Sequence, residues 1–280
     1  MPSEASSRRA PSGKGPSIKE TSLRETRAFG RELERLLLLK SSPVAVELLE
    51  NEKDIPKRAI RPGKDRGAHI ALCQAFAMSR RERVTVAMTK EDHWCWAPLI
   101  GFGLTDPPDF YLEGKTAFPR MVSDLEAARE LARTEPRLET GKYAAILSAP
   151  LKSAAFRPDA VLIYGNSAQI RTILLAVKYE EGCRVESTFD PLDSCVHSLV
   201  PVIKDGRYRI TMPDPGEYQR ALATEDEIIF SLAGSRLPAL VSGLRHIEGM
   251  NHGYGVFSPD MRPDFPQPDF YKELFRLMGL

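Results

Sequence analysis

Two apolar runs in the middle of the chain, residues 143–149 and 160–164, restrict the possible folds most. Both are nearly all apolar, which is typical of strands that are buried on both faces. Further candidate strands lie at 44–48, 84–88 and 226–232. Because segments with helical spacing alternate with these runs, we predict an α/β (or α+β) fold, a single domain with a central mixed sheet flanked by helices. The connection between the first two runs is too short for a crossover helix, so we expect them to pair with each other.

The spacing of apolar residues also predicts the helices. Leucine and phenylalanine recur at helical intervals over 22–40, and similar patterns occur over 68–78, 123–134, 168–179 and 235–246. Five helices interspersed with short strands fit the layered arrangement expected for this fold class.

The two ends of the chain differ in composition from its middle. Residues 1–18 are rich in Ser, Pro, Gly and Arg and hold little to bury, which predicts a disordered leader. We assign residues 19–248 to the α/β domain. Residues 249–280 form a C-terminal arm, rich in Pro, Gly and aromatic residues, that ends in a short amphipathic helix. Such an arm typically packs across its own domain or across another subunit, so we expect it to support a homo-oligomer.

Composition excludes several classes of partner. The formal net charge is +1 over 280 residues, so no global field favours nucleic acid, and we expect no nucleic-acid partner. No apolar run approaches the roughly 20 residues needed to cross a bilayer, so we expect no membrane partner. The chain has 4 cysteines, and their wide spacing argues against a disulfide framework and for a reducing, cytoplasmic compartment.

Three of the four cysteines have a histidine within four residues, which exceeds chance for a chain with 5 histidines in 280 positions. The pairs are His69 with Cys73, His93 with Cys95, and His197 with Cys195. Cys95 lies between Trp94 and Trp96 at the end of a predicted strand, a place where α/β proteins carry their chemistry. We therefore expect the three cysteines to converge on one thiolate-lined pocket with the tryptophans as walls.

Local context refines these assignments. His69 and Cys73 are four residues apart in a predicted helix, which is the spacing that two ligands on one helix face require. The alternative is that Cys73 is a small buried hydrophobe and His69 faces solvent. Cys195 lies close to the start of a possible helix, where the helix dipole would lower its thiol pKa. Cys183 begins an alternating run over 183–189 that predicts a strand, has no histidine nearby, and is interpreted as structural.

The chain also resembles a known family. The pieces that carry the resemblance occur in a fixed order: Pro43-Val44-Ala45-Val46, Leu72-Cys73-Gln74-Ala75, Thr89-Lys90-Glu91-Asp92 followed by Cys95, Ala149-Pro150-Leu151, and Asp226-Glu227-Ile228-Ile229-Phe230-Ser231. Over roughly residues 22–248 this order is similar to domain-of-unknown-function family 169. The family pattern has cysteines matching Cys73, Cys95 and Cys195, so the resemblance implies a fold and a candidate site, and it implies no reaction. Where members often continue Pro-Gly-Gly after the second cysteine, this chain has Trp96-Ala97-Pro98.

Three thiolates from separate segments are the minimum for an iron–sulfur cluster with one open iron, and with a histidine they also hold zinc. We therefore predict Cys73, Cys95 and Cys195 as ligands, with His93 as a further ligand or a proton carrier. Haem is another possibility, with a cysteine or histidine as axial ligand and Trp94 or Trp96 against the porphyrin. Such a cofactor would serve a redox or small-molecule conversion, and the partner would be a small-molecule substrate or an electron-transfer protein.

Two alternatives need no metal. In a cysteine-dependent enzyme, Cys195 would be the nucleophile with His197 or His93 as its base, and His93 is better placed because residues two apart on a helix point in different directions. In a small-molecule binding protein, the cysteines would be core residues. The sequence lacks a phosphate-binding loop, a dinucleotide fingerprint and a His-Glu-x-x-His motif, so it does not name a substrate.

Overall fold

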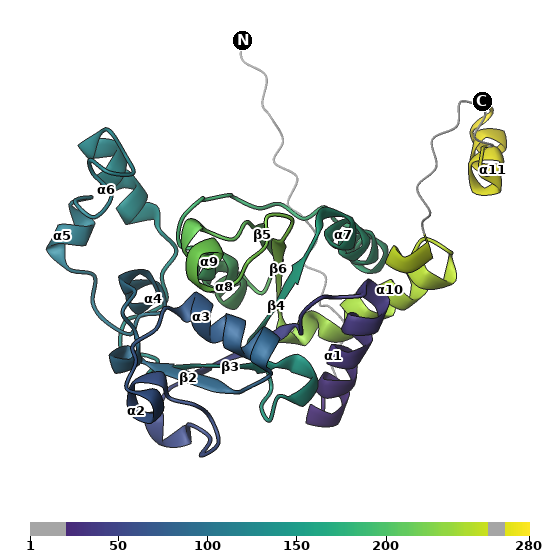
Figure 1. Cartoon of the computed structure of the whole chain (residues 1–280). Coiled ribbons are helices and arrows are strands. Elements are labelled where there is room, and N and C mark those ends of the chain that lie inside the picture. The colour runs from purple at the N-terminus through teal and green to yellow at the C-terminus, as the bar shows by residue number, and fades with distance from the viewer. Residues whose placement is uncertain (1–20, 257–266) are drawn as a thin grey trace, which may run out of the picture.

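The structure of the chain is a computed structural model that describes residues 21–256 and 267–280 (Figure 1). A six-stranded sheet in the order β2-β3-β1-β4-β6-β5 forms its centre. The strands are β1 (Val44–Leu49), β2 (Val86–Thr89), β3 (Ala145–Pro150), β4 (Ala160–Gly165), β5 (Arg209–Thr211) and β6 (Ile228–Ala233). Each neighbouring pair is antiparallel, and parallel pairing in the described chain is confined to two isolated bridges. The predicted α/β fold, a sheet flanked by helices, is confirmed, with antiparallel rather than mixed pairing between its strands.

Strand β1 lies between the two apolar runs that restrict the fold. Val46 of β1 is opposite Ser148 of β3 on one side and Ala160 of β4 on the other. The expectation that the runs at 143–149 and 160–164 pair with each other is therefore wrong. An apolar run indicates that a strand is buried on both faces, but it does not specify which strand lies beside it.

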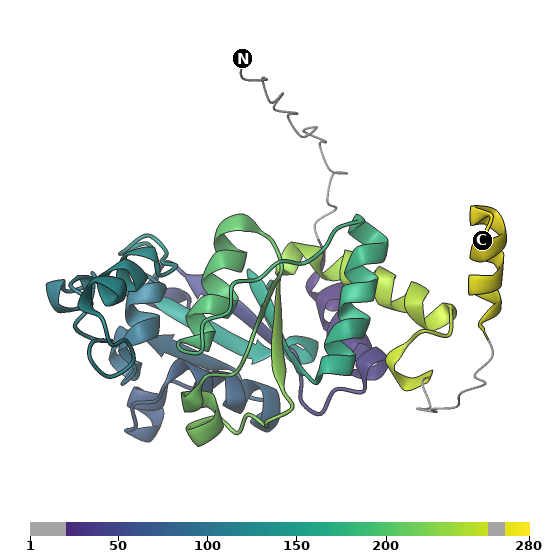
Figure 2. The ribbon, with the colours of Figure 1, turned by 90° about the horizontal axis from the view of Figure 1, so that it is seen from above.

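Helices cover both faces of this sheet, which explains why its strands are apolar throughout. Alternate residues of β1 show the division, because Ala45 packs in the core on one face and Val44 and Val46 pack in the core on the other. The first face is covered by α1 (Leu23–Leu37), α7 (Ser167–Glu181) and α10 (Leu237–Gly249), which lie together in Figures 1 and 2. The second face is covered by α3 (Leu72–Ala77), α4 (Trp96–Gly101) and α8 (Ser194–Asp205).

The other helices are short or peripheral. They are α2 (Pro62–Arg66), α5 (Asp109–Leu112), α6 (Leu125–Thr134), α9 (Pro215–Arg220) and α11 (Asp269–Met278), together with a π-helical turn, η2 (Met78–Glu82), and the 3-10 turns η1 (Glu52–Asp54), η3 (Lys90–Asp92), η4 (Leu151–Ser153), η5 (Gly234–Arg236) and η6 (Tyr254–Val256). Helix caps are local and readable from the sequence. The Asn166 side chain, for example, accepts a hydrogen bond of 2.9 Å from the backbone N–H of Gln169 at the start of α7.

Two local predictions are wrong. The predicted helix over 68–78 begins only at Leu72, so His69 precedes the helix and does not share a helix face with Cys73. The backbone at Ile70 instead pairs with His93, which keeps this segment extended. The alternating run at 183–189 is a loop without strand partners, because alternation alone does not provide a neighbouring strand.

A close contact fixes α1 against the turn that follows β3. A Cβ atom added at Gly30 would lie 2.5 Å from the backbone nitrogen of Lys152 in η4. Only glycine permits this approach. The contact brings the last turns of α1 beside Lys152, whose ammonium lies 2.8 Å from Glu34 Oε2.

The two ends of the chain are described only in part. The predicted leader, residues 1–18, lies outside the described residues. Within the predicted arm, the chain continues to η6 and resumes at residue 267, before α11. The α11 side chains Phe270, Phe275 and Leu277 are exposed. Within residues 21–256 and 267–280, no helix combines the length and the apolar character that a bilayer crossing requires.

Candidate functional site

Three cysteines from three separate segments meet on the second face of the sheet. Cys73 lies in α3, Cys95 immediately precedes α4, and Cys195 is the second residue of α8. Cys95 packs against the apolar cluster that contains Cys73 and also against the one that contains Cys195. Negative charge on Cys73 or on Cys95 would raise the pKa of Cys195, so the thiols lie within electrostatic range of one another.

The thiols of this group are shielded from solvent and uncharged near neutral pH. Cys73 and Cys195 are each 7% exposed, and Cys95 is partly buried. Burial raises the pKa of all three thiols, and nearby carboxylates, Asp214 among them, raise these pKa values further. The expectation that the start of α8 lowers the pKa of Cys195 is therefore wrong, because desolvation outweighs the helix dipole. Cys183 lies apart from the group and is exposed.

A pocket of about 410 Å³ opens beside Cys95. Its walls include Trp94, Trp96 and Tyr111, and Cys95 is the one cysteine among its lining residues. The expected pocket lined by all three thiols is therefore not found here, because Cys73 and Cys195 are buried in the core. The Trp96 and Tyr111 rings lie 5.5 Å apart between centres. The guanidinium of Arg220 lies 4.7 Å from the centre of the Trp94 ring, which is a favourable cation–π arrangement. The pocket thus offers aromatic surface next to a thiol, with two arginines, Arg120 and Arg220, and three carboxylates, Glu135, Asp190 and Asp193, in its lining. This combination suits a small planar ligand that carries polar groups.

Buried acidic groups lie beneath the thiols. The Ser194 hydroxyl is 2.6 Å from Glu217 Oε1 and 2.9 Å from Asp214 Oδ2. Glu217 is 1% exposed, and burial raises its pKa to about 7. The Tyr164 hydroxyl lies 3.4 Å from the same Glu217 oxygen. Because its pKa lies near neutrality, Glu217 can hold or release a proton at this position with little cost.

A second acidic group forms part of the pocket wall. Asp193 precedes α8 in a left-handed conformation with φ of 51°. Burial and the nearby Glu135 raise its pKa to about 7. His197 Nε2 lies 3.1 Å from Glu135 Oε1; although burial opposes protonation, this hydrogen bond raises the pKa of His197. His197 therefore contacts Glu135, and no hydrogen bond joins it to Cys195 in the described chain.

His93 has a different environment from the one predicted. It is 7% exposed, and neither ring nitrogen has a hydrogen-bond partner among the described residues. Burial lowers its pKa to about 4, so the ring is neutral. Neither ring nitrogen of His93 therefore hydrogen-bonds to Cys73, Cys95 or Cys195. The roles predicted for His93, as a ligand or a proton carrier, stay predictions.

The three thiols are donors of the type that a thiolate-bound cofactor needs, but their arrangement does not form a complete binding site. Three convergent thiols are soft donors of the kind that iron–sulfur clusters and zinc take. However, no three His, Cys, Asp or Glu side chains in the described ranges are arranged to hold a metal ion. A cofactor at this place would require the thiols to lose their protons and close around it.

Comparison with known proteins places the chain in a family. The family model DUF169, described as uncharacterised ArCR, matches residues 32–243. The chain belongs to the DUF169 family. A similar curated protein, an uncharacterized protein of Methanocaldococcus jannaschii, is 24% identical over 226 residues, which are 79% of this chain and 94% of that protein. No solved structure matches the chain. The resemblance expected from the sequence is therefore confirmed, and all three clustered cysteines of this DUF169 protein lie inside the matched range.

Two carboxylates of the candidate site, the buried Glu217 and the half-buried Asp214, were not found from the sequence. Asp214 and Glu217 belong to the motif Asp-Pro-Gly-Glu at the start of α9, in which Asp214 caps the helix by accepting a 2.9 Å hydrogen bond from the Glu217 backbone. This motif is readable as a helix start. Its position beneath the cysteines is not readable, because it depends on the packing of α9 against α3.

Proposed function

We propose that this DUF169 protein binds a cofactor through the thiolates of Cys73, Cys95 and Cys195, with an iron–sulfur cluster as the first candidate and zinc or haem as alternatives. The observation that supports this is the proximity of three thiols from α3, the residue before α4, and α8, one of which, Cys95, lines a pocket of about 410 Å³. A cluster held by three thiolates would supply an open iron for a redox or small-molecule conversion.

The chain's own residues would have three tasks in this function. The thiols must ionise on binding, since the thiolate is the metal ligand, and their raised pKa values make that step dependent on pH. Glu217, with a pKa of about 7, is placed to take up or pass on a proton. Arg220 supplies positive charge near Cys73 and Cys95, which favours their thiolates.

An anaerobic purification tests the proposal, combined with an absorption spectrum and iron, sulfide and zinc analysis. Iron and sulfide with broad visible absorption support the cluster, a sharp Soret band identifies haem, and a colourless protein with zinc identifies zinc. Cys73→Ser, Cys95→Ser and Cys195→Ser should each lose the bound group. Cys183→Ser is the matched control, because Cys183 is exposed and away from the pocket.

Two results would overturn the proposal. One is a colourless and metal-free protein after anaerobic purification and after incubation with iron and sulfide. The other is retention of the bound group in all three site variants, or its equal loss in Cys183→Ser.

The second candidate is a small-molecule binding protein without a cofactor. It is favoured by the uncharged thiols and by the aromatic walls formed by Trp94, Trp96 and Tyr111. A cysteine-dependent enzyme is less well supported, because its nucleophile requires a thiolate and the pKa of Cys195 is raised. Equilibrium binding of planar aromatic acids to metal-free protein, measured by tryptophan fluorescence, tests this candidate. Trp94→Leu should weaken that binding.

We further propose a setting for this activity. The protein would work in the cytoplasm, with a small-molecule substrate or an electron-transfer protein as its partner and without nucleic acid. The exposed apolar residues of α11 support the proposal of a homo-oligomer formed through the C-terminal arm. Sedimentation of the full chain against a chain ending before α11 measures this contribution.

A further inference from the structure

A second hollow, of about 250 Å³, lies apart from the thiol pocket. It is formed where the end of α1 and the following loop meet η2 and η4. Its charged lining consists of Lys40, Arg80, Arg81, Arg83, Lys152 and Glu34. The hydroxyl-bearing residues Ser41 and Ser42 also line it, and Leu39 is its one apolar lining residue. The hollow is therefore almost wholly polar.

Positive charge exceeds negative charge in and around this hollow. The five cationic side chains face one lining carboxylate, Glu34, and two more carboxylates outside the lining, Asp226 and Glu227. Glu34 lies 2.8 Å from Lys152, and Asp226 lies 3.2 Å from Lys40. In the described chain, no hydrogen bond or ion pair engages the Arg83 guanidinium. An anion entering the hollow would thus meet charge that the protein leaves uncompensated.

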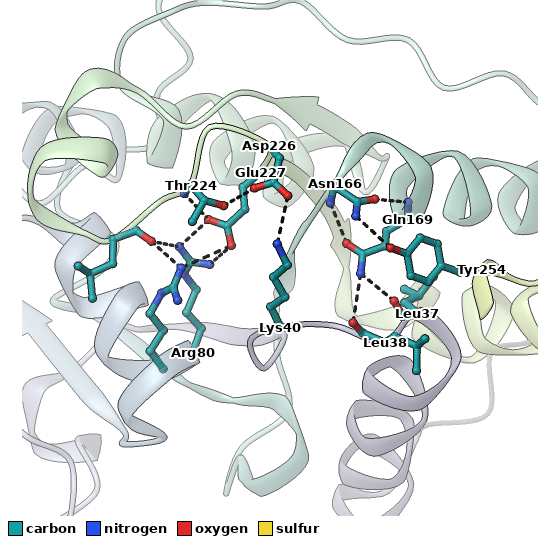
Figure 3. Close-up of polar contacts among 12 residues, drawn as sticks. Leu37, Leu38, Lys40, Arg80, Asn166, Gln169, Thr224, Asp226, Glu227 and Tyr254 are labelled. Atoms are coloured by element: carbon teal, nitrogen blue, oxygen red, sulfur yellow. Dashed lines mark hydrogen bonds and ion pairs between the residues drawn. The ribbon is translucent and has the colours of Figure 1, made fainter. Parts of the chain in front are cut away.

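Buried hydrogen bonds hold the floor of the hollow in place. Arg80 has a side chain only 1% exposed, and Glu227 accepts two of its hydrogen bonds, of 2.6 and 3.0 Å. The same guanidinium donates to the Ser41 hydroxyl at 3.2 Å. In Figure 3, the side chains of Arg80 and Lys40 come from neighbouring segments, and both side chains point toward the loop that carries Asp226 and Glu227. These contacts hold the cationic groups in place before any ligand arrives.

The backbone of η2 and of the residue after it has an unusual conformation at the arginines that line the hollow. Arg80 and Arg81 both lie in the π-helical turn η2, and such turns recur at functional sites. Arg83, which ends the turn, has a left-handed conformation with φ of 63°. Arg81 donates a 2.5 Å hydrogen bond to the carbonyl of Leu222, a residue that is itself left-handed with φ of 58°. Non-glycine residues hold this conformation only where the surroundings impose it.

We propose that this hollow binds the phosphate group of a small phosphate-bearing molecule. The Arg83 guanidinium matches phosphate oxygens in geometry and charge. The Ser41 hydroxyl accepts a hydrogen bond from Arg80 and can still donate one to the phosphate, whereas the Ser42 hydroxyl already donates to Glu34 at 2.7 Å. Arg83 and Lys40 are the exposed groups that would close on the ligand. The proposal concerns a place separate from the thiol pocket and does not depend on the cofactor proposed there.

Isothermal titration calorimetry of the full chain with inorganic phosphate, at constant ionic strength set with sodium chloride, tests this site. The test variant is Lys40→Gln/Arg83→Gln, which removes two charges from the hollow. The matched control is Lys57→Gln/Arg58→Gln, which removes two charges from exposed residues outside it. Succinate, a dicarboxylate, distinguishes phosphate recognition from general anion binding. Thermal unfolding without phosphate checks that each variant folds, and Arg83→Gln alone replaces the pair if it does not.

The expected result is saturable phosphate binding that weakens about tenfold or more in the test variant and stays unchanged in the control. A phosphate monoester such as glycerol 3-phosphate should bind at least as tightly as phosphate. Absence of saturable phosphate binding would overturn the proposal, as would an equal loss in the two variants. Succinate binding as tight as that of phosphate would overturn the assignment to phosphate.

Discussion

The guanidinium carbon of Arg80 lies 3.9 Å from the centre of the Tyr164 ring. Arg80 is bound on its other side by Glu227, and the Tyr164 hydroxyl lies 3.4 Å from Glu217. A continuous buried path therefore runs from the basic hollow at η2 to the carboxylates beneath the cysteines. Each group along it is desolvated, so each charge depends on its neighbours.

Removing the Arg80 charge should destabilise the protein strongly, because Glu227 would be left as a buried, unpaired carboxylate. We expect Arg80→Met to lower the free energy of unfolding by about 3–5 kcal/mol, measured by urea denaturation. The control is Arg81→Met, whose side chain is 30% exposed, and its cost should stay within about 1 kcal/mol. Equal costs for the two variants would contradict the importance of the buried pair.

Glu217 should make stability depend on pH in a defined direction. Its pKa rises from 4.5 to about 7 on folding, so the folded state binds more protons than the unfolded state between these values. The contribution to stability is fully present below about pH 4.5 and is lost as the pH rises to about 7, with a total of about 3 kcal/mol.

The test for Glu217 is the free energy of unfolding of the Glu217→Gln variant across this pH range. Since glutamine does not titrate, the decline between about pH 5 and 7 should become shallower than in the unaltered protein. Glu225→Gln is an exposed control and should leave the slope as it is. An unchanged slope in Glu217→Gln would contradict the raised pKa.

Gly30 should not tolerate a side chain. The added methyl group of Gly30→Ala would lie 2.5 Å from the Lys152 nitrogen and 2.9 Å from the Leu151 carbonyl carbon. Because both atoms belong to the backbone, α1 or η4 must shift, at a cost of about 1–3 kcal/mol. Gly249→Ala, where a Cβ atom meets nothing within 4 Å, should be neutral or stabilising. Thermal unfolding of both variants measures the difference.

The four thiols should react at very different rates. Cys183 is exposed, whereas Cys73 and Cys195 are buried and uncharged, and alkylation requires an accessible thiolate. In native protein, iodoacetamide should modify Cys183 first and Cys73 and Cys195 only as fast as the structure opens. Peptide mass spectrometry over a time course measures this order, and urea should abolish it. Rapid native alkylation of Cys195 would contradict the shielded arrangement.

The sequence predicted the layers of this fold better than the connections between its strands. Apolar runs located β3 and β4 because burial on both faces leaves a continuous pattern. Their separation by β1 was not predictable in this way, since strand order is set by contacts between residues far apart in the chain. The loop at 183–189 shows the same limit, because an alternating pattern forms a strand only where a partner exists.

The features of the candidate site that depend on residue type could be predicted from the sequence. The features that depend on how the elements pack together could not. The proximity of the three cysteines and the tryptophans beside Cys95 were expected from composition around Cys95 and from the family resemblance, but the position of Cys73 and Cys195 outside the pocket lining was not. The helix pairing of His69 with Cys73 failed because α3 begins three residues after His69. The acidic groups Asp193 and Glu217 have raised pKa values only because neighbouring elements remove water from them.

The strand order has a consequence for how the polypeptide is made. Residues 44–49 leave the ribosome early, yet their two partners are residues 145–150 and 160–165. About a hundred residues must therefore be synthesised before this strand gains either neighbour. Until then, its apolar side chains are exposed on the nascent chain, where they are open to aggregation or to binding by chaperones.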